Sequence, residues 1–285
     1  MTILSKAARD EFDTPLERLL ASVANLRQQP TSKGAHFYRT SLRRFQAWQE
    51  VFQPHLDAEQ QQAFKFLDKL RKASGKLRDS EVHLKLIESL SRVATADKMK
   101  VAKELKARRK SSIKKLKLLL RDSMLSSIWG ALRVLDKSPG QADGSPVSIA
   151  GATELALEEY RGFVQRLGPL SPESLHEYRL QCKRFRYTAE LAGESPKREL
   201  LIATWKKAQD VIGEWHDYLT LSEVAKTVVG NTVLNTELLK RTRRKYQESL
   251  RAVARCEQKL LVSAGGIPKK EPKRARLAPS SSQVA

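Results

Sequence analysis

The sequence has few cysteines and no long apolar segment. Two cysteines, Cys182 and Cys256, do not make a disulfide framework and form no C-x-x-C pair. A reducing cytoplasm is therefore the expected compartment. No run approaches the roughly 18 apolar residues that a membrane-spanning helix needs, and the first residues lack an apolar signal core. We expect neither membrane insertion nor secretion.

Acidic and aromatic residues are also scarce. The chain of 285 residues has 32 Asp plus Glu against 53 Lys plus Arg, a formal net charge of +21. Positive charges in such excess repel one another in the folded state, and they suggest a polyanionic partner. Nucleic acid, an anionic membrane surface and inorganic polyanions all fit. Aromatic residues make up only 6% of the chain. The positions at which they occur, described below, favour packing in the core over the base stacking that single-strand binders use.

Strand-like alternation is rare, whereas apolar residues recur at spacings of three and four. This pattern predicts an all-α fold. The expected helices are 14–28, 35–53, 57–73, 79–94, 97–135, 149–167, 172–192, 197–211, 215–229 and 232–262. Capping residues at Thr14, Asp57 and Ser171 mark three of the starts.

A segment rich in Gly, Pro, Ser and Asp separates two helical halves. It covers 136–151 and is predicted to be a linker between an N-terminal half, 1–135, and a C-terminal half, 152–262. Residues 263–285 are basic and almost free of apolar side chains, so they are predicted to form a disordered tail.

Two short motifs each occur twice, in the same order. HFYRTSLRRF at 36–45 returns as HEYRLQCKRF at 176–185, and GKLRD at 75–79 returns as GEWHD at 213–217. The offsets of 140 and 138 residues are nearly equal. Two motifs at matched spacing predict that the halves are duplicated helical units.

On a helical wheel each decamer has a cationic face opposite an apolar face. In the second copy, the cations within about 80° of His176 are Arg179, Lys183 and Arg186. The opposite, core-facing residues are Tyr178, Cys182 and Phe185. No acid lies within 37–48 or 178–189, although surface helices usually intersperse acids to relieve repulsion. The repeated, uncompensated charge favours an anion site over a merely solvated surface.

The remaining motifs give little sign of metal binding or catalysis. The five histidines are scattered without H-x-x-x-H or H-E-x-x-H spacing, so no metal site is expected. No P-loop, nucleophile elbow or paired-carboxylate site is found. We therefore expect a binding module without a cofactor, and not an enzyme.

The segment HEYRLQCKRFRY, with its first copy and the GKLRD and GEWHD motifs, resembles the conserved histidine α-helical domain, or CHAD domain. The resemblance covers roughly residues 10 to 262. It implies two bundles of about four main helices each, related by a pseudo-twofold axis around a basic cavity or groove. It also implies binding of inorganic polyphosphate and, in some members, residence on polyphosphate granules.

Carried onto this chain, the resemblance and the cationic faces give one candidate binding set. It comprises His36, Arg39, Arg43, Arg44, Lys69, Lys72, Arg78, His176, Arg179, Lys183, Arg184, Arg186, Lys206 and Lys207. Asp79 and Asp217 are predicted to cap helices or orient arginines. The first copy has Gln46 where the second has Arg186, so a looser grip is expected there.

Two other functions stay open. The same charge could serve a sequence-tolerant nucleic-acid binder, or a scaffold that recruits acidic proteins. The segment 98–121 has eleven basic residues and one acid, which fits an added binding face, an interaction arm or a solubilising exterior. The sequence does not determine the oligomeric state.

Overall fold

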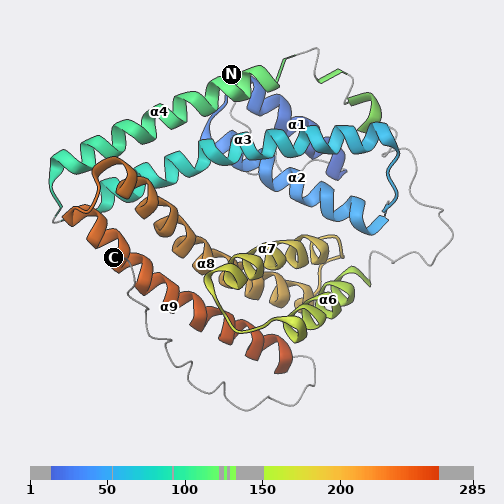
Figure 1. The fold of residues 1–285 in the computed structure, drawn as a ribbon. Coiled ribbons are helices and arrows are strands. Elements are labelled where there is room, and N and C mark those ends of the chain that lie inside the picture. The colour runs from blue at the N-terminus through green and yellow to red at the C-terminus, as the bar shows by residue number, and fades with distance from the viewer. Residues whose placement is uncertain are drawn as a thin grey trace.

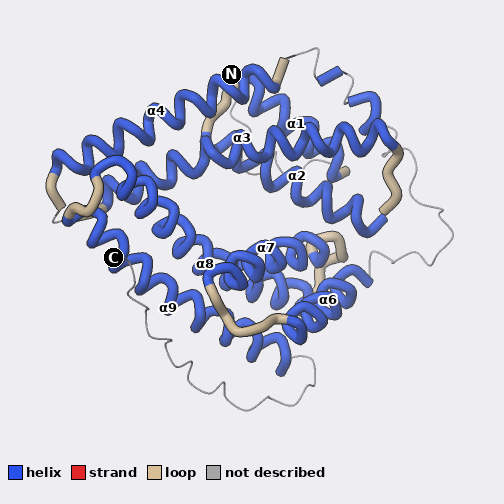
Figure 2. The backbone as a smooth tube through the Cα atoms, viewed as in Figure 1, coloured by secondary structure: helices blue, strands red, loops and turns tan. Residues whose placement is uncertain are grey.

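The structure is a computed structural model that describes residues 14–52, 54–91, 93–121, 125–126, 129–132 and 151–262. All its regular elements are helices, and the described residues include no strand (Figures 1 and 2). The N-terminal helices are α1 (Pro15–Gln28), α2 (Ser32–Phe52), α3 (Ala58–Ser89) and α4 (Thr95–Leu119). The C-terminal helices are α6 (Ala152–Arg166), α7 (Pro172–Ala189), α8 (Pro196–Val229) and α9 (Val233–Val262). The all-α prediction is confirmed, whereas most of the predicted linker and the whole predicted tail lie outside the described residues.

The helix starts follow the predicted capping residues. The Thr14 hydroxyl accepts from the Glu17 backbone N–H, and the Glu17 carboxylate accepts from that of Thr14. Asp57 and Gln60 form the same reciprocal pair at α3, and Ser171 caps α7. These side chains satisfy backbone donors that have no partner within the helix.

The second motif of each half lies inside a long helix. The predicted helices 57–73 and 79–94 form one helix of 32 residues, α3, and 197–211 and 215–229 form one of 34 residues, α8. The predicted breaks at GKLRD and GEWHD are wrong, because the glycines there adopt helical backbone and serve a packing purpose described below. The helix predicted over 97–135 is also too long, since α4 ends at Leu119.

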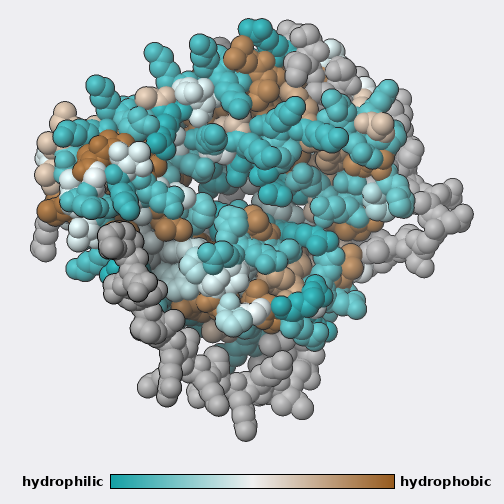
Figure 3. Space-filling model, viewed as in Figure 1, coloured by the Kyte–Doolittle hydropathy of each residue, from teal (hydrophilic) through white to brown (hydrophobic). Residues whose placement is uncertain are grey.

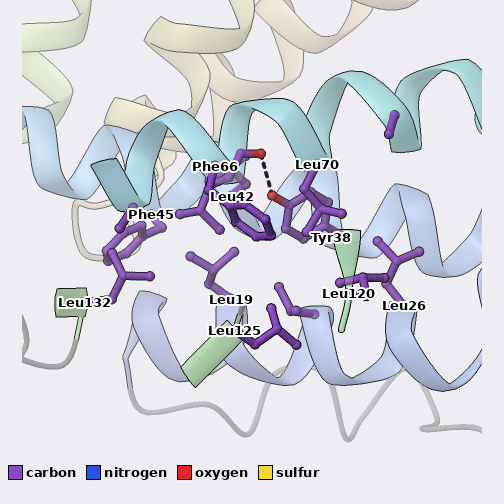
Figure 4. Close-up of a cluster of buried hydrophobic side chains, with 14 of the residues drawn as sticks. Leu19, Leu26, Tyr38, Leu42, Phe45, Phe66, Leu70, Leu120, Leu125 and Leu132 are labelled. Carbon is purple, nitrogen blue, oxygen red and sulfur yellow. Dashed lines mark hydrogen bonds between the residues drawn. The ribbon is translucent and has the colours of Figure 1, made fainter. Parts of the chain in front are cut away.

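Each half has its own hydrophobic core. In the N-terminal half, α1, α2 and α3 enclose Leu19, Leu42 and Leu70, and the Tyr38 hydroxyl donates to the Leu67 carbonyl at 2.8 Å (Figure 4). In the C-terminal half, α6, α7, α8 and α9 pack around Trp205. The bulk of each core therefore comes from one half of the chain.

A third cluster joins the two halves. The turn between α3 and α4 and the turn between α8 and α9 lie together at the left of Figure 1. There the N-terminal half contributes Ile87, Leu90, Val101 and Leu105, and the C-terminal half contributes Tyr218, Leu221, Ala225, Leu234 and Leu238. We call these nine residues the shared cluster. Because α3 and α8 both run into it, it fixes the two halves against each other.

The view of Figure 3 is mostly hydrophilic, including the boundary between the halves. In the part of the chain that the structure describes, no helix is long and apolar enough to cross a membrane.

Candidate functional site

The two decamers lie on α2 and α7, which contact each other across the boundary between the halves. Their apolar faces are buried as predicted, with Tyr38 and Tyr178 both fully inaccessible to solvent. Their cationic faces therefore point away from the cores. Tyr38 and Tyr178 are core residues and offer no platform for base stacking.

Arg39 of α2 crosses α3 at Gly75. Its Nη1 donates to the Arg71 carbonyl at 2.8 Å, and a Cβ on Gly75 would stand 2.7 Å from the same nitrogen. Any larger residue at 75 would collide with the guanidinium. The glycine of the GKLRD motif thus makes room for the arginine of the decamer.

The C-terminal half has the equivalent arrangement. Arg179 of α7 passes over Gly213 of α8, where a Cβ would stand 3.4 Å from Nε. This Nε is buried and has no hydrogen-bond acceptor among the described residues. The recurring arginine-over-glycine contact explains why each decamer is followed by a glycine-containing motif. The duplication of the halves stays a prediction.

Cations from both halves converge at this boundary. Burial lowers the pKa of Lys183 to about 6, and the positive charges that lower it further are those of Arg179, Arg39, Arg43 and Arg78. Burial also lowers the pKa of Arg39 to about 10. We call Arg39, Arg43, Arg78, Arg179 and Lys183 the central cluster. It combines side chains of α2, α3 and α7 in one strongly positive site.

Two carboxylates lie beside the central cluster. Burial raises the pKa of Asp217 to about 6, against the opposing effect of Arg179. Asp79 acts in turn on Arg39 and Arg179, favouring their charged forms. Both aspartates lie within long helices, so the prediction that they cap helices is wrong. The alternative, that they orient these arginines, stays a prediction.

Histidines also meet at this boundary. The rings of His176 on α7 and His216 on α8 lie 5.4 Å apart between centroids, at 34°. Burial lowers the pKa of His216 to about 4, and the nearby Arg179 lowers it further. His83 of α3 is buried and hydrogen-bonds through Nε2 with the Thr220 hydroxyl of α8 at 3.0 Å. Across the described residues no group of three or more metal-ligating side chains occurs.

Three of the predicted binding arginines are engaged in ion pairs. Arg44 of α2 donates to Glu190 at 2.7 Å, and Arg186 contacts the same carboxylate at 3.3 Å. Arg184 of α7 contacts Glu50 of α2 at 3.2 Å and also Glu159. These ion pairs connect α2, and with it the N-terminal half, to the C-terminal half. Arg44, Arg184 and Arg186 thus each contact an acidic side chain of the protein itself.

The remaining predicted residues lie around the site without joining the central cluster. His36 is exposed on α2, and Lys69, Lys72, Lys206 and Lys207 are exposed on α3 and α8. Lys72 forms an ion pair with Asp68 at 3.0 Å. Besides its burial, the causes that lower the pKa of Lys183 are the charges of the arginines of the central cluster, and these other predicted residues are not among them.

Sequence reasoning missed Arg71 and His216. Arg71 lowers the pKa of Arg39 and Arg43 by its charge, after the effect of burial. It lies seven residues before Arg78, two helical turns away, and so on the same face of α3. That relationship follows from the sequence once α3 is taken as one continuous helix. His216 stands in GEWHD where Arg78 stands in GKLRD, so the motif alignment could have identified it.

Comparisons with known proteins bear on the family and the fold. A family model described as CHAD domain matches residues 12–226. The solved structure of PptA from Streptomyces chartreusis superposes with a TM-score of 0.65 at 15% identity, covering 86% of this chain and 98% of that chain. At that identity the likeness concerns the fold alone. No curated protein matches the chain.

Proposed function

Because the chain belongs to the CHAD domain family, whose members are associated with polyphosphate, we propose that it binds inorganic polyphosphate at the central cluster without cleaving it. The observation that carries the proposal is that α2 and α7 meet at the boundary between the halves and bring four arginines of α2, α3 and α7 around the Lys183 amine. The acidic side chains that oppose this positive charge are Asp79, Asp210 and Asp217 beside Arg179, and Asp68 and Glu50 beside Arg43. A bound polyanion would relieve the repulsion that the free protein maintains.

The chemistry of the cluster suits a chain of phosphates. Polyphosphate carries about one negative charge per phosphate and has no bases to recognise, so its affinity must come from cations and released counterions. Arginine forks grip two phosphate oxygens at once, and lysine acts as a mobile point charge.

A nucleic-acid binder is the main alternative. Single-strand binders stack bases on accessible rings, but the exposed large hydrophobic residues in the described part of the chain are Met99, Leu118, Leu180, Val233 and Leu239, with no aromatic among them. This composition favours a ligand without bases. A scaffold for acidic proteins would bind its partners equally well after polyphosphate has been digested.

The test is a binding titration with the double variant Arg179→Gln and Lys183→Met, which removes the arginine charge and the charge that Lys183 gains when a polyanion binds. We expect the affinity for polyphosphate to fall at least about tenfold, and the salt dependence to become shallower by about one to two counterions. The matched control is Lys65→Gln with Lys240→Gln, two exposed lysines on α3 and α9. Equal affinity and salt slope in both variants would refute the proposed site.

Two further measurements complete the test. Duplex DNA or RNA should not displace polyphosphate at equal phosphate concentration. Incubation with polyphosphate should release no orthophosphate, as expected of a binding module. The association with granules predicts that a fluorescent fusion forms foci in cells that make polyphosphate and stays diffuse in cells that do not.

A further inference from the structure

The outer face of α4 carries a row of lysines. The helix buries only the narrow strip of Val101, Leu105, Ser112 and Leu116. The lysines within about 80° of one another on the opposite side are Lys103, Lys106, Lys110, Lys114 and Lys117. We call these five the lysine stripe. They lie within fifteen residues, and the first and last are about 21 Å apart along the helix at 1.5 Å per residue.

The lysine stripe is not neutralised. All five side chains are exposed, and none forms an ion pair with a described residue. Glu104 pairs with Arg108, which is off the stripe, and no acid follows it before the end of α4. Like charges three and four residues apart repel each other along a helix. An accessible row of this kind is thus poised for an extended anion.

The lysine stripe is separate from the central cluster. α4 packs on α3 and α8 through its buried strip, so the stripe points away from the boundary between the halves. In Figure 1 α4 forms the upper left edge of the molecule, and in Figure 3 this edge carries projecting hydrophilic side chains. The two sites are thus distinct surfaces of one protein.

We propose that the lysine stripe is a second polyanion-binding surface that holds a distal stretch of the polyphosphate chain bound at the central cluster. This inference rests on the proposed function. Two linked sites on one flexible chain turn the second contact into an intramolecular event and raise the affinity without new chemistry. The protein would then bind long chains more tightly than short ones.

The side chains of α4 favour this ligand over the other polyanions. The helix has no aromatic residue for base stacking, and its stripe consists of lysine point charges, which suit phosphate oxygens. Its strongly exposed apolar residues are Met99 and Leu118, which are too few to insert into a membrane interface. A flexible anionic chain without bases matches a straight row of lysines best.

The experiment compares the triple variant Lys106→Glu, Lys110→Glu and Lys114→Glu with the control Lys33→Glu, Lys65→Glu and Lys240→Glu. The control residues are exposed on three different helices, and the charge change is the same. Each full-length protein is titrated with tripolyphosphate, with polyphosphate of about 100 phosphates and with duplex DNA. Tripolyphosphate is shorter than the roughly 21 Å stripe and cannot occupy both sites. Circular dichroism and a Lys→Gln version of the triple variant check that folding is intact.

We expect the triple variant to bind the long chain at least about tenfold more weakly, with a salt slope shallower by about two to three counterions. Its affinity for tripolyphosphate should stay within about twofold of the control. Unchanged binding of the long chain, an equal loss for both chain lengths, or a loss confined to DNA would each overturn the inference. The variant Arg179→Gln with Lys183→Met separates this from the proposed function. If that variant keeps its tripolyphosphate affinity, the central site itself is wrong.

Discussion

Arg39 lies across Gly75 so closely that a single added carbon would stand 2.7 Å from its Nη1. In the other half, Arg179 and Gly213 have the same relationship, with 3.4 Å between the added carbon and Nε. The first distance is a collision and the second an ordinary contact. The two glycines therefore serve as each other's control.

Gly75→Ala should separate stability from binding. Alanine favours a helix interior by up to about 1 kcal/mol over glycine, and the colliding atom is the far end of a flexible side chain. We expect the free energy of unfolding to stay level or rise, while displacement of Arg39 lowers the affinity for polyphosphate several-fold. Gly213→Ala should stabilise the fold and keep its affinity. Denaturant unfolding and binding titrations measure the two effects, and equal affinity in both variants would contradict the positioning of Arg39.

Polyphosphate binding should take up protons near neutral pH. The pKa of Lys183 in the free protein is lowered to about 6 by burial, and then by Arg179. A bound polyanion favours the charged form and raises this pKa. Affinity should therefore increase as the pH falls from about 8 to 6. Calorimetry in two buffers of different ionisation enthalpy should detect the uptake, and Lys183→Met should reduce it. The proton uptake that remains in Lys183→Met should fall further when Asp217→Asn is added, because the pKa of Asp217 is also about 6.

Lys183 should also make the stability of the free protein depend on pH. Its pKa is about 6 when folded and about 10.4 in an unfolded chain. Between these values the unfolded state binds more protons, so the contribution of Lys183 to stability rises with pH. As the pH rises from 6 to 9, the free energy of unfolding of the protein should increase relative to that of Lys183→Met. A pH-independent difference would mean that Lys183 titrates normally.

Glu190→Gln should destabilise the protein. It removes the charge that both Arg44 and Arg186 contact, in a site where the Glu190 side chain is only 16% exposed. Unpaired, partly buried arginines should cost about 1–2 kcal/mol. Glu50→Gln is the matched change in an exposed pair with Arg184, and it should cost less than about 1 kcal/mol. Thermal unfolding of both variants measures the difference, and equal losses would argue against a special role for Glu190.

The sequence predicted the fold class and the helix faces because both depend on local periodicity. Tyr38 and Tyr178 are buried where the wheel placed them. The sequence did not predict that the helices continue through Gly75 and Gly213, because a glycine inside a helix is disfavoured unless a neighbouring side chain needs the space. That neighbour, Arg39 or Arg179, is more than thirty residues away in the chain. The need for glycine becomes visible only in the packed structure.

The candidate site was predicted as two cationic faces, and the structure divides its members further. Arg43 and Lys183 belong to the central cluster, whereas Arg44 and Arg184 meet acids from other helices. A wheel places a side chain on one face of its own helix but says nothing of which acids will approach from elsewhere. The expected weakness of the first copy at Gln46 stays a prediction.

The shared cluster has a consequence for either half of the chain when it is produced alone. Four of its apolar residues come from the N-terminal half and five from the C-terminal half. A polypeptide containing either half alone would leave its portion of this surface facing water, which costs roughly 25 cal/mol for each Å² of apolar area. Such fragments should be poorly soluble singly and should reassociate when expressed together.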